Sequence, residues 1–314
     1  MKRFFASAHH SGQHLIHDPA TGLTHTSLDP VPPGRVELDE HTVSSWPTIH
    51  PGEVGVRDPI SVCWSPLVRC NLSCPHCLDD KALPEQHPAD RLRIARLLAR
   101  SQIMGVDISG GEPLLLRDLT TLCAVLTAAG LVVSVTTNGW HLQRRAPELR
   151  GKVDAIAVSL DGPTAQVHDS WRGAGSFSHA VAGVRACTDL GIRVQLQTVL
   201  MVNTIDHAQQ MVDLAADLEV GGVTFLQMLP IGEGKALTSS QMLSDPTADQ
   251  IVSALSVPEQ VQVRLRRRDA AGGFSVLRAD GRLWRNGRSA EGIGALRSLR
   301  QVEDLAVDGR DGSA

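Results

Sequence analysis

A regular alternation of apolar runs and amphipathic stretches between residues 59 and 230 constrains the fold more than any other feature. Apolar residues recur at helical spacing between six short runs that are rich in valine and isoleucine. Such runs indicate strands of a parallel sheet that is covered by crossover helices. The pattern therefore predicts an α/β fold of repeated strand–helix units, as a barrel or an open sheet. The expected strands are 59–66, 105–109, 131–139, 153–162, 192–200 and 221–229, and the expected helices are 88–104, 117–130, 178–191 and 206–219.

Composition is that of an ordinary globular protein. The chain has 314 residues, 42% of them hydrophobic and 20% charged, with a formal net charge of −4. No apolar run approaches the ~18–20 residues of a membrane-spanning helix, and His9 and His10 interrupt the apolar patch of a poor signal peptide. We therefore expect a cytoplasmic protein with reduced cysteines, and the charge gives no sign of a nucleic-acid or membrane partner.

Three of the six cysteines lie within eight residues, in the stretch RCNLSCPHCLDD at 69–80. Cys70, Cys74 and Cys77 have the spacing C-x3-C-x2-C and follow the first predicted strand. A structural zinc site usually has two C-x2-C pairs, and the second pair is missing here. An iron–sulfur cube held by three cysteines would leave one iron open for chemistry. A reduced loop without metal is the third interpretation.

This cysteine loop resembles the signature of the radical SAM superfamily. The resemblance implies that Cys70, Cys74 and Cys77 hold one [4Fe–4S] cluster, whose open iron is chelated by S-adenosylmethionine (SAM). His76 takes the usual aromatic position before the third cysteine. The fold of the superfamily is a partial (β/α)6 barrel, which agrees with the six predicted strands. Chemistry in such barrels lies at the carboxyl ends of the strands.

Four further motifs match the superfamily in the expected order, each at the end of a predicted strand. They are ISGGEPLL at 108–115, TTNG at 136–139, VSLDGPTAQVHDSWRG at 158–173 and FLQMLPIGEGKAL at 225–237. An arginine suits a carboxylate because its planar fork binds both oxygens. The resemblance implies these SAM contacts: Ser109, Gly110, Gly111 and Glu112 to the amino group, Asn138 to the ribose, and Ser159 and Arg172 to the carboxylate.

The two ends of the chain are expected to differ from the core. We predict an irregular N-terminal arm or small hairpin at 1–58, the radical SAM core at 59–237, and a C-terminal extension at 238–314. The extension resembles the end of the SPASM domain, which occurs in the branch of peptide maturases and molybdenum-cofactor cyclases. It contains no cysteine for an auxiliary cluster. We therefore expect a single cluster and a cysteine-free remnant that closes the barrel.

Two further groups of residues have open interpretations. Cys63, Cys123 and Cys187 lie in apolar segments, where packing in the core is expected, and the alternative is that one of them donates hydrogen to a substrate radical. The arginines between 264 and 300 form either a solvated face or a patch for an anionic partner.

These residues together predict a radical SAM enzyme. The resemblance implies reductive cleavage of SAM and hydrogen abstraction from a substrate by the 5′-deoxyadenosyl radical, with an electron from a flavodoxin or ferredoxin. A ribosomally made precursor peptide is the first substrate class that we expect, and a small metabolite such as a sugar, nucleoside or sugar acid is the alternative. A non-catalytic metal-binding scaffold is the rival from another class, but it has no need of Glu112, Ser159 and Arg172. The catalytic residue that meets the substrate is not identified by the sequence.

Overall fold

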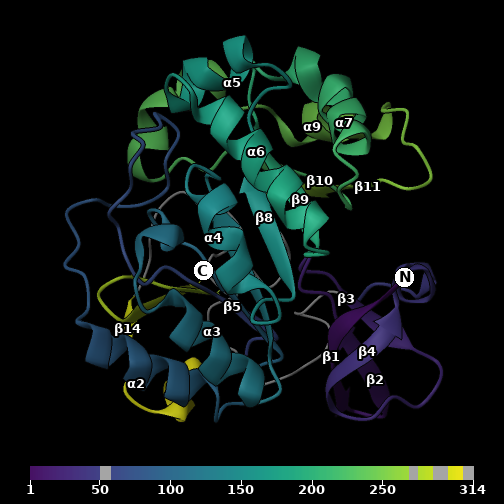
Figure 1. Cartoon of the computed structure of the whole chain (residues 1–314), viewed down its shortest axis with the longest axis vertical. Coiled ribbons are helices and arrows are strands. Elements are labelled where there is room, and N and C mark those ends of the chain that lie inside the picture. The colour runs from purple at the N-terminus through teal and green to yellow at the C-terminus, as the bar shows by residue number, and fades with distance from the viewer. Residues whose placement is uncertain (50–57, 269–274, 286–295, 307–314) are drawn as a thin grey trace.

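The computed structural model describes residues 1–49, 58–268, 275–285 and 296–306. Within these ranges a ten-stranded sheet carries helices on its outer side, and a separate four-stranded antiparallel sheet lies at the N-terminus (Figure 1). The predicted α/β class and the partial barrel are confirmed. None of the helices in the described part of the chain is long and apolar enough to cross a membrane.

All six predicted core strands are present, and they pair in parallel in the order of the sequence. Each strand neighbours the next one along the chain, so the sheet is wound in a single direction. Residues from all of these strands line one common cavity, so the sheet curves around an open barrel. The strands are β5 (Ser61–Trp64), β6 (Gly105–Ile108), β7 (Val132–Thr137), β8 (Ala155–Ser159), β9 (Val194–Leu200) and β10 (Gly222–Gln227).

Four strands beyond residue 237 extend this sheet at both edges. The strand β11 (Gln262–Arg266) adds in parallel beside β10, and β12 (Ser275–Leu277) adds in parallel beside β5. The antiparallel strands β13 (Arg282–Arg285) and β14 (Arg297–Ser298) follow β12 outward. The C-terminal extension therefore continues the barrel sheet at both of its edges.

Helices of the crossover connections cover the outer side of the barrel. The predicted helix at 88–104 ends at Leu98, because the Ser101 hydroxyl donates to the Leu98 carbonyl (2.7 Å) and turns the chain. The helices are α2 (Pro88–Leu98), α3 (Leu119–Ala128), α4 (Leu142–Leu149), α5 (Ala165–Arg172), α6 (Ser176–Asp189), α7 (Ala208–Asp217), α8 (Thr238–Gln241) and α9 (Asp245–Ser253), with 3-10 turns η2 (Pro113–Leu115), η3 (Ile205–His207), η4 (Gly232–Leu237) and η5 (Val302–Leu305).

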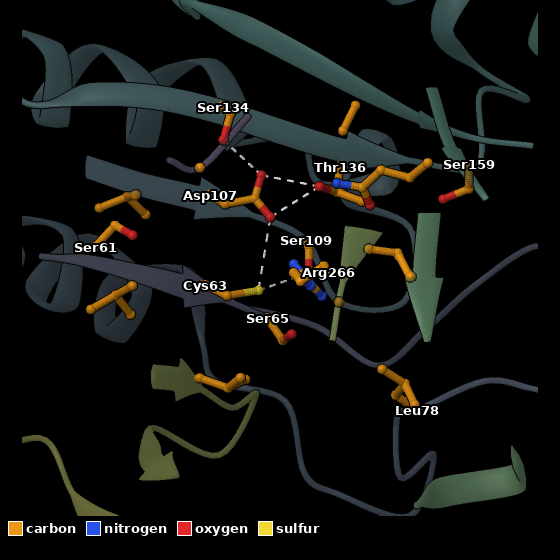
Figure 2. Close-up of a pocket in the computed structure, with 18 of the residues that line it drawn as sticks. Ser61, Cys63, Ser65, Leu78, Asp107, Ser109, Ser134, Thr136, Ser159 and Arg266 are labelled. Carbon is orange, nitrogen blue, oxygen red and sulfur yellow. Dashed lines mark hydrogen bonds between the residues drawn. The ribbon is translucent and has the colours of Figure 1, made fainter. Parts of the chain in front are cut away.

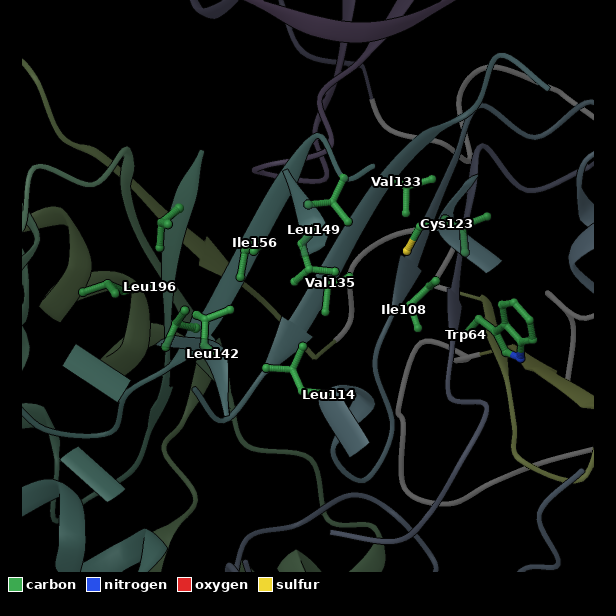
Figure 3. Packing of buried hydrophobic residues seen from close by; sticks show 14 of the residues in the cluster. Trp64, Ile108, Leu114, Cys123, Val133, Val135, Leu142, Leu149, Ile156 and Leu196 are labelled. Atoms are coloured by element: carbon green, nitrogen blue, oxygen red, sulfur yellow. The ribbon is translucent and has the colours of Figure 1, made fainter. Parts of the chain in front are cut away.

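Side chains of the barrel strands alternate between the helices and the cavity. Val133 and Val135 of β7 are buried beneath the helices (Figure 3), whereas Ser134 and Thr136 of the same strand line the cavity. This alternation is expected for a strand, because successive side chains point to opposite faces. The inner face is thus more polar than the apolar runs indicated. The outer face carries the main core, with Trp64, Ile108, Ile156 and Leu196 from the strands and Leu114, Cys123, Leu142 and Leu149 from the crossovers.

The first 45 residues form an ordered sheet, so the predicted irregular arm is wrong. The small hairpin is confirmed within 14–29, where β2 and β3 pair on either side of the DPATG turn at 18–22. Apolar side chains of the sheet pack on both of its faces. The sequence did not show this pattern, because many histidines stand among the apolar residues. The strands have the order β3-β2-β1-β4, with β1 (Lys2–His10), β2 (Gln13–His17), β3 (Thr24–Ser27) and β4 (Gly34–Asp39), followed by α1 (Glu40–Ser45).

One face of this N-terminal sheet packs against the amino ends of the barrel strands. Ala6 and Leu15 share an apolar cluster with Ile60, Met104 and Val132 of the barrel. An ion pair between Arg35 and the buried Asp154 (2.5 Å) joins the two parts. The segment from His17 to Thr24 lines the same cavity as the barrel strands. The N-terminal sheet therefore closes the amino end of the barrel.

Candidate active site

The cysteine loop follows β5 and lies at the carboxyl ends of the barrel strands. Cys70, Cys74 and Cys77 all line the cavity and are all partly exposed. The Cys77 amide donates to the Cys74 carbonyl (3.2 Å), which closes a turn around the last two cysteines. Burial raises the pKa of the Cys77 thiol to about 11, and it raises the pKa of Cys70 and Cys74 as well. The structure thus brings the three predicted ligands to one end of one cavity.

Two glycines after β6 support the base of the cysteine loop. The Gly111 amide donates to the Leu67 carbonyl (2.9 Å), and the Glu112 amide donates to the Arg69 carbonyl (2.9 Å). A Cβ atom on Gly111 would lie 2.1 Å from the Arg69 carbonyl oxygen, and one on Gly110 would lie 2.5 Å from the Leu67 carbonyl oxygen. Only glycine permits this approach of two backbones. The GGE motif is therefore a cradle for the loop.

Glu112 has no exposed surface and fixes this turn to the neighbouring strand. One carboxylate oxygen accepts from the Leu114 amide (2.9 Å) and the Thr137 hydroxyl (2.7 Å), and the other accepts from the Asn138 amide (2.9 Å). Burial raises the pKa of Glu112, while these hydrogen bonds act against the rise. The carboxylate therefore links the ends of β6 and β7, which carry two of the predicted SAM motifs.

The PIGEG segment after β10 supports the other side of the cysteine loop. The Gly234 amide donates to the Cys77 carbonyl (3.3 Å). Gly232 has a φ of +59°, and a Cβ atom there would lie 2.5 Å from the Cys77 carbonyl oxygen. A side chain at Gly232 would be both strained and in collision with the loop. The fourth motif thus contacts the last cysteine through its backbone.

Asp161, at the end of β8, joins four elements around the cysteines. Its carboxylate is fully buried and accepts from Arg172 Nε (2.5 Å), His76 Nε2 (3.1 Å) and the Val199 amide (2.9 Å). Its own amide donates to His168 Nδ1 (3.0 Å). The charges of Arg172 and His76 overcome the cost of burial and hold the pKa of Asp161 far below its usual range. The sequence analysis missed this role, although Asp161 stood in the quoted SLDG motif.

The remaining predicted SAM residues also border the cysteines. Asn138 donates to Asn71 Oδ1 (3.0 Å) and approaches the Cys70 sulfur (3.6 Å), while Ser159 lines the cavity at the end of β8. Arg172 is almost buried, and its charge interacts with Cys74 and Cys77. The structure therefore brings all predicted metal-binding and SAM-binding residues to the carboxyl end of one barrel.

The arrangement of the thiols fits a cluster better than a single ion. Among the described residues, no three His, Cys, Asp or Glu side chains converge closely enough for one metal ion. A [4Fe–4S] cube does not need such convergence, because each thiolate binds a different iron. The positive charge of Arg172 beside the cysteines favours their thiolate form. The three cysteines would therefore hold three irons of a cube.

The cavity below the cysteines has a volume of about 640 Å³, and a group of polar side chains interrupts its mostly apolar wall. At its centre, Asp107 accepts from the hydroxyls of Ser134 (2.8 Å) and Thr136 (3.0 Å), and the Cys63 thiol approaches it (3.8 Å), as Figure 2 shows. Burial raises the pKa of Asp107, and these donors oppose the rise. Sequence reasoning missed Asp107, although a carboxylate inside an apolar strand run was a readable signal.

The three other cysteines have different surroundings. Cys123 and Cys187 are fully buried in the helix–sheet core, as predicted. The prediction of core packing is wrong for Cys63, which lines the cavity and lies 3.4 Å from the Ser109 hydroxyl. Its position in β5 turns it inward, because its neighbours Val62 and Trp64 take the outer face.

The arginines after residue 260 do not form one face, so the interpretation as a single patch is wrong. Arg264 and Arg266 line the cavity, whereas Arg267 pairs with Asp249 (2.6 Å) and Arg268 pairs with Asp245. Arg278 lies near Asp80 (3.9 Å), next to the cysteine loop. Residue 288 of the predicted patch lies outside the described residues. The charges thus belong to several separate environments.

Comparison with known proteins agrees with this geometry. Residues 64–215 match the profile of the Radical SAM superfamily. The chain is 34% identical over 176 residues to the mycofactocin maturase MftC of Mycolicibacterium smegmatis, which covers 52% of this chain and 43% of that protein. It is 30% identical over 192 residues to the GTP 3′,8-cyclase of Marinobacter nauticus, which covers 56% and 58%. The chain thus spans about half the length of the curated relatives that it matches.

A solved structure also shares the architecture. The crystal structure of Streptococcus suis SuiB bound to the precursor peptide SuiA has a TM-score of 0.65, at 12% identity, over 81% of this chain and 66% of that chain. At this identity the likeness shows the fold alone. From the matched profile, the barrel and the cysteine loop, the chain belongs to the radical SAM superfamily. Its sequence is related to those of the MftC maturases and the GTP 3′,8-cyclases, and membership implies a [4Fe–4S] cluster and SAM.

Proposed function

We propose that this enzyme binds one [4Fe–4S] cluster through Cys70, Cys74 and Cys77 and cleaves SAM reductively beside it. The observation that carries the proposal is the convergence of these thiols, the GGE cradle and Arg172 at one end of one cavity. When bound, the cluster and SAM supply a 5′-deoxyadenosyl radical that takes a hydrogen atom from the substrate.

The residues of the chain orient SAM and keep the reaction away from water. Asp161 holds Arg172 by its Nε atom, which leaves the other guanidinium nitrogens for the SAM carboxylate. The carboxylate oxygens of Glu112 already accept three hydrogen bonds, so we assign Glu112 to the turn and the amino-group contact to the backbone of Ser109, Gly110 and Gly111. We assign the ribose to Asn138 and a second carboxylate contact to Ser159.

A ribosomally made peptide is our first candidate for the substrate. It is supported by the maturase MftC, to which this chain is 34% identical over 176 residues, and by the precursor peptide in the SuiB structure. In this proposal a side chain of the peptide enters the barrel cavity from its carboxyl end. A flavodoxin or ferredoxin supplies the electron in a reducing cytoplasm, because the step requires a low-potential cluster.

A small metabolite is the second candidate, and the shape of the cavity favours it. The N-terminal sheet closes the amino end of the barrel, and hydroxyls and charges line the wall around Asp107. A volume of about 640 Å³ matches the ~300–1,000 Å³ of small-molecule sites. A sugar, nucleoside or sugar acid would fill this space.

Anaerobic reconstitution tests the proposed function directly. The wild type is expected to hold about four irons per chain and to release 5′-deoxyadenosine slowly from SAM and dithionite without substrate. Replacement of Cys70, Cys74 or Cys77 by Ala removes a ligand and abolishes both, whereas Cys187→Ala, in the buried core, is the matched control that retains both. Eight irons per chain, or SAM cleavage without the three cysteines, would contradict the proposal.

A further inference from the structure

The strand β11 places two arginines in the inner cavity of the barrel. Arg264 and Arg266 stand two residues apart, so they share one face of the strand, and both line the cavity. Val263 and Leu265 take the opposite face and pack against the outer core. The register of the strand is thereby fixed, because a slip by one residue would move two charges into the core.

The surroundings of Arg264 do not balance its charge. Its guanidinium donates to the neutral carbonyl of Thr21 next to the N-terminal sheet, and within the described residues no carboxylate lies in ion-pair contact with it. The nearby carboxylate of Asp18 attracts Arg264 but makes no ion-pair contact with it, and it accepts from the Ala20 amide (2.8 Å) and the Thr21 hydroxyl (2.7 Å). Burial and the charge of Arg266 lower the pKa of Arg264 to about 10.

The other charges of the cavity leave this surplus in place. Arg266 lies near Asp107 and Cys63, and Figure 2 shows all three among the residues that line the cavity. Of the two carboxylates that line the cavity, Asp79 interacts with Arg278, so Asp107 is left for the two arginines and can balance only one of them. At the cysteine end, Arg172 is balanced by Asp161 and Arg278 lies near Asp80. The uncompensated positive charge is therefore at the β11 wall, below the site proposed for SAM.

We propose that the substrate group that enters the cavity is an anion, a carboxylate or a phosphate, bound by Arg264 and Arg266. Guanidinium forks recognise both groups through paired hydrogen bonds. The opposite wall, with Ser134, Thr136 and Asp107, offers partners to hydroxyls of the same molecule. The inference rests on the proposed function for its relation to SAM, and it names the substrate chemistry of that site.

Calorimetry on cluster-loaded, SAM-bound protein tests the proposal with defined probes. Inorganic phosphate and glucuronate are expected to bind, and glucose, which lacks the charge, is expected not to bind. Arg264→Gln and Arg266→Gln should each weaken glucuronate by about thirtyfold or more, because each removes one partner of a buried charge pair. Arg267→Gln is the matched control, since it changes the same charge on the half-exposed opposite face and should leave the affinity within about twofold.

Further measurements distinguish a misfolded variant from one that binds weakly, and a peptide anion from a small-metabolite anion. Arg264→Lys keeps the charge but not the paired hydrogen bonds, so it should bind glucuronate more tightly than Arg264→Gln and less tightly than the wild type. Melting temperatures show whether each variant is folded. Stronger binding of a blocked Gly-Glu-Gly peptide than of glucuronate assigns the anion to a peptide side chain, and the reverse assigns it to a small metabolite. Equal binding of glucose and glucuronate, no anion binding, or an equal loss in Arg267→Gln overturns the proposal. If the wild type releases no 5′-deoxyadenosine, that result would instead overturn the proposed function and leave the anion result unaffected.

Discussion

The replacement Asp161→Asn tests whether one buried carboxylate sets the geometry of the cysteine loop. The asparagine keeps an oxygen for the Val199 amide but loses the charge that Arg172 and His76 share. Its amide NH2 group would then face the donor of Arg172. Removing one partner of a buried ion pair costs about 3–5 kcal/mol, because the other charge stays buried and uncompensated. A shift of ~6–20 °C in the melting temperature is expected at ~2–4 °C per kcal/mol.

The assay compares stability with cofactor binding. Metal-free protein is melted by circular dichroism, and reconstituted protein is assayed for iron and for SAM affinity. Asp118→Asn is the matched control, because Asp118 forms a two-bond ion pair with Arg91 (2.8 and 2.9 Å) between α2 and the start of α3, and neither residue lines the cavity. Both variants should lose stability, but only Asp161→Asn should also lose iron and bind SAM at least about tenfold more weakly.

Two results would refute this reasoning. If Asp161→Asn keeps full iron content and wild-type SAM affinity, the carboxylate does not position Arg172 or the loop through His76. If Asp118→Asn loses iron equally, the loss reports general destabilisation of the barrel. The pH dependence gives a third readout. Because the pKa of Asp161 is lowered in the folded state, its stabilisation is present above the unfolded pKa of ~3.9 and is lost as the pH falls below that value.

Three further predictions concern separate residues. Gly111→Ala should prevent cluster retention, since its Cβ would lie 2.1 Å from the Arg69 carbonyl oxygen. Gly151→Ala, whose Cβ would meet no atom, should cost only ~1–2 kcal/mol of strain in the left-handed backbone. Equal iron content in the two variants would contradict the role of the GGE motif as a support for the cysteine loop. Arg172→Ala should weaken SAM binding in equilibrium dialysis at unchanged iron content, and unchanged affinity would remove Arg172 from the SAM site. Burial lowers the pKa of His17 from 6.5 to about 4, so the unfolded chain takes up the proton first, and the free energy of unfolding falls by about 2 kcal/mol between pH 7 and 5. In urea titrations, this fall should be smaller by the same amount in His17→Gln than in the wild type, and an equal pH dependence of the two proteins would contradict the prediction.

The sequence was sufficient for the core of the barrel because two signals there are local. Apolar runs of strand length alternate with helical periodicity, and each of the six strands was found where it was expected. The carboxyl ends of parallel strands meet at one edge, so motifs that are far apart in sequence had to converge. The cysteine loop, the GGE turn, Asn138 and Arg172 could therefore be placed together before any coordinates were known.

The N-terminal sheet and the late strands were not predictable by the same means. In the N-terminal sheet, histidines and serines occupy positions that are buried by the barrel, as His17 is, so the sequence lacked a clear apolar period. The strands β11 and β12 are short, and β12 joins the barrel through β5, more than 200 residues before it. Pairing across such distances leaves no local pattern. Ion-pair partners were equally unpredictable, since no sequence pattern near Arg172 shows that it pairs with Asp161.

In strand β11, the face of the strand on which an arginine side chain lies decides the role of that arginine. In the sequence, Arg266, Arg267 and Arg268 are three equal charges, and a solvated face and an anion patch were both possible. In the fold, Val263 and Leu265 must reach the core beside α9, so Arg264 and Arg266 must face the cavity. Arg267 then faces outward, where the acid Asp249 of α9 meets it. Charged side chains are costly inside a barrel unless they have a partner, and the retention of Arg264 without an ion pair among the described residues is best explained by a substrate that brings the missing negative charge.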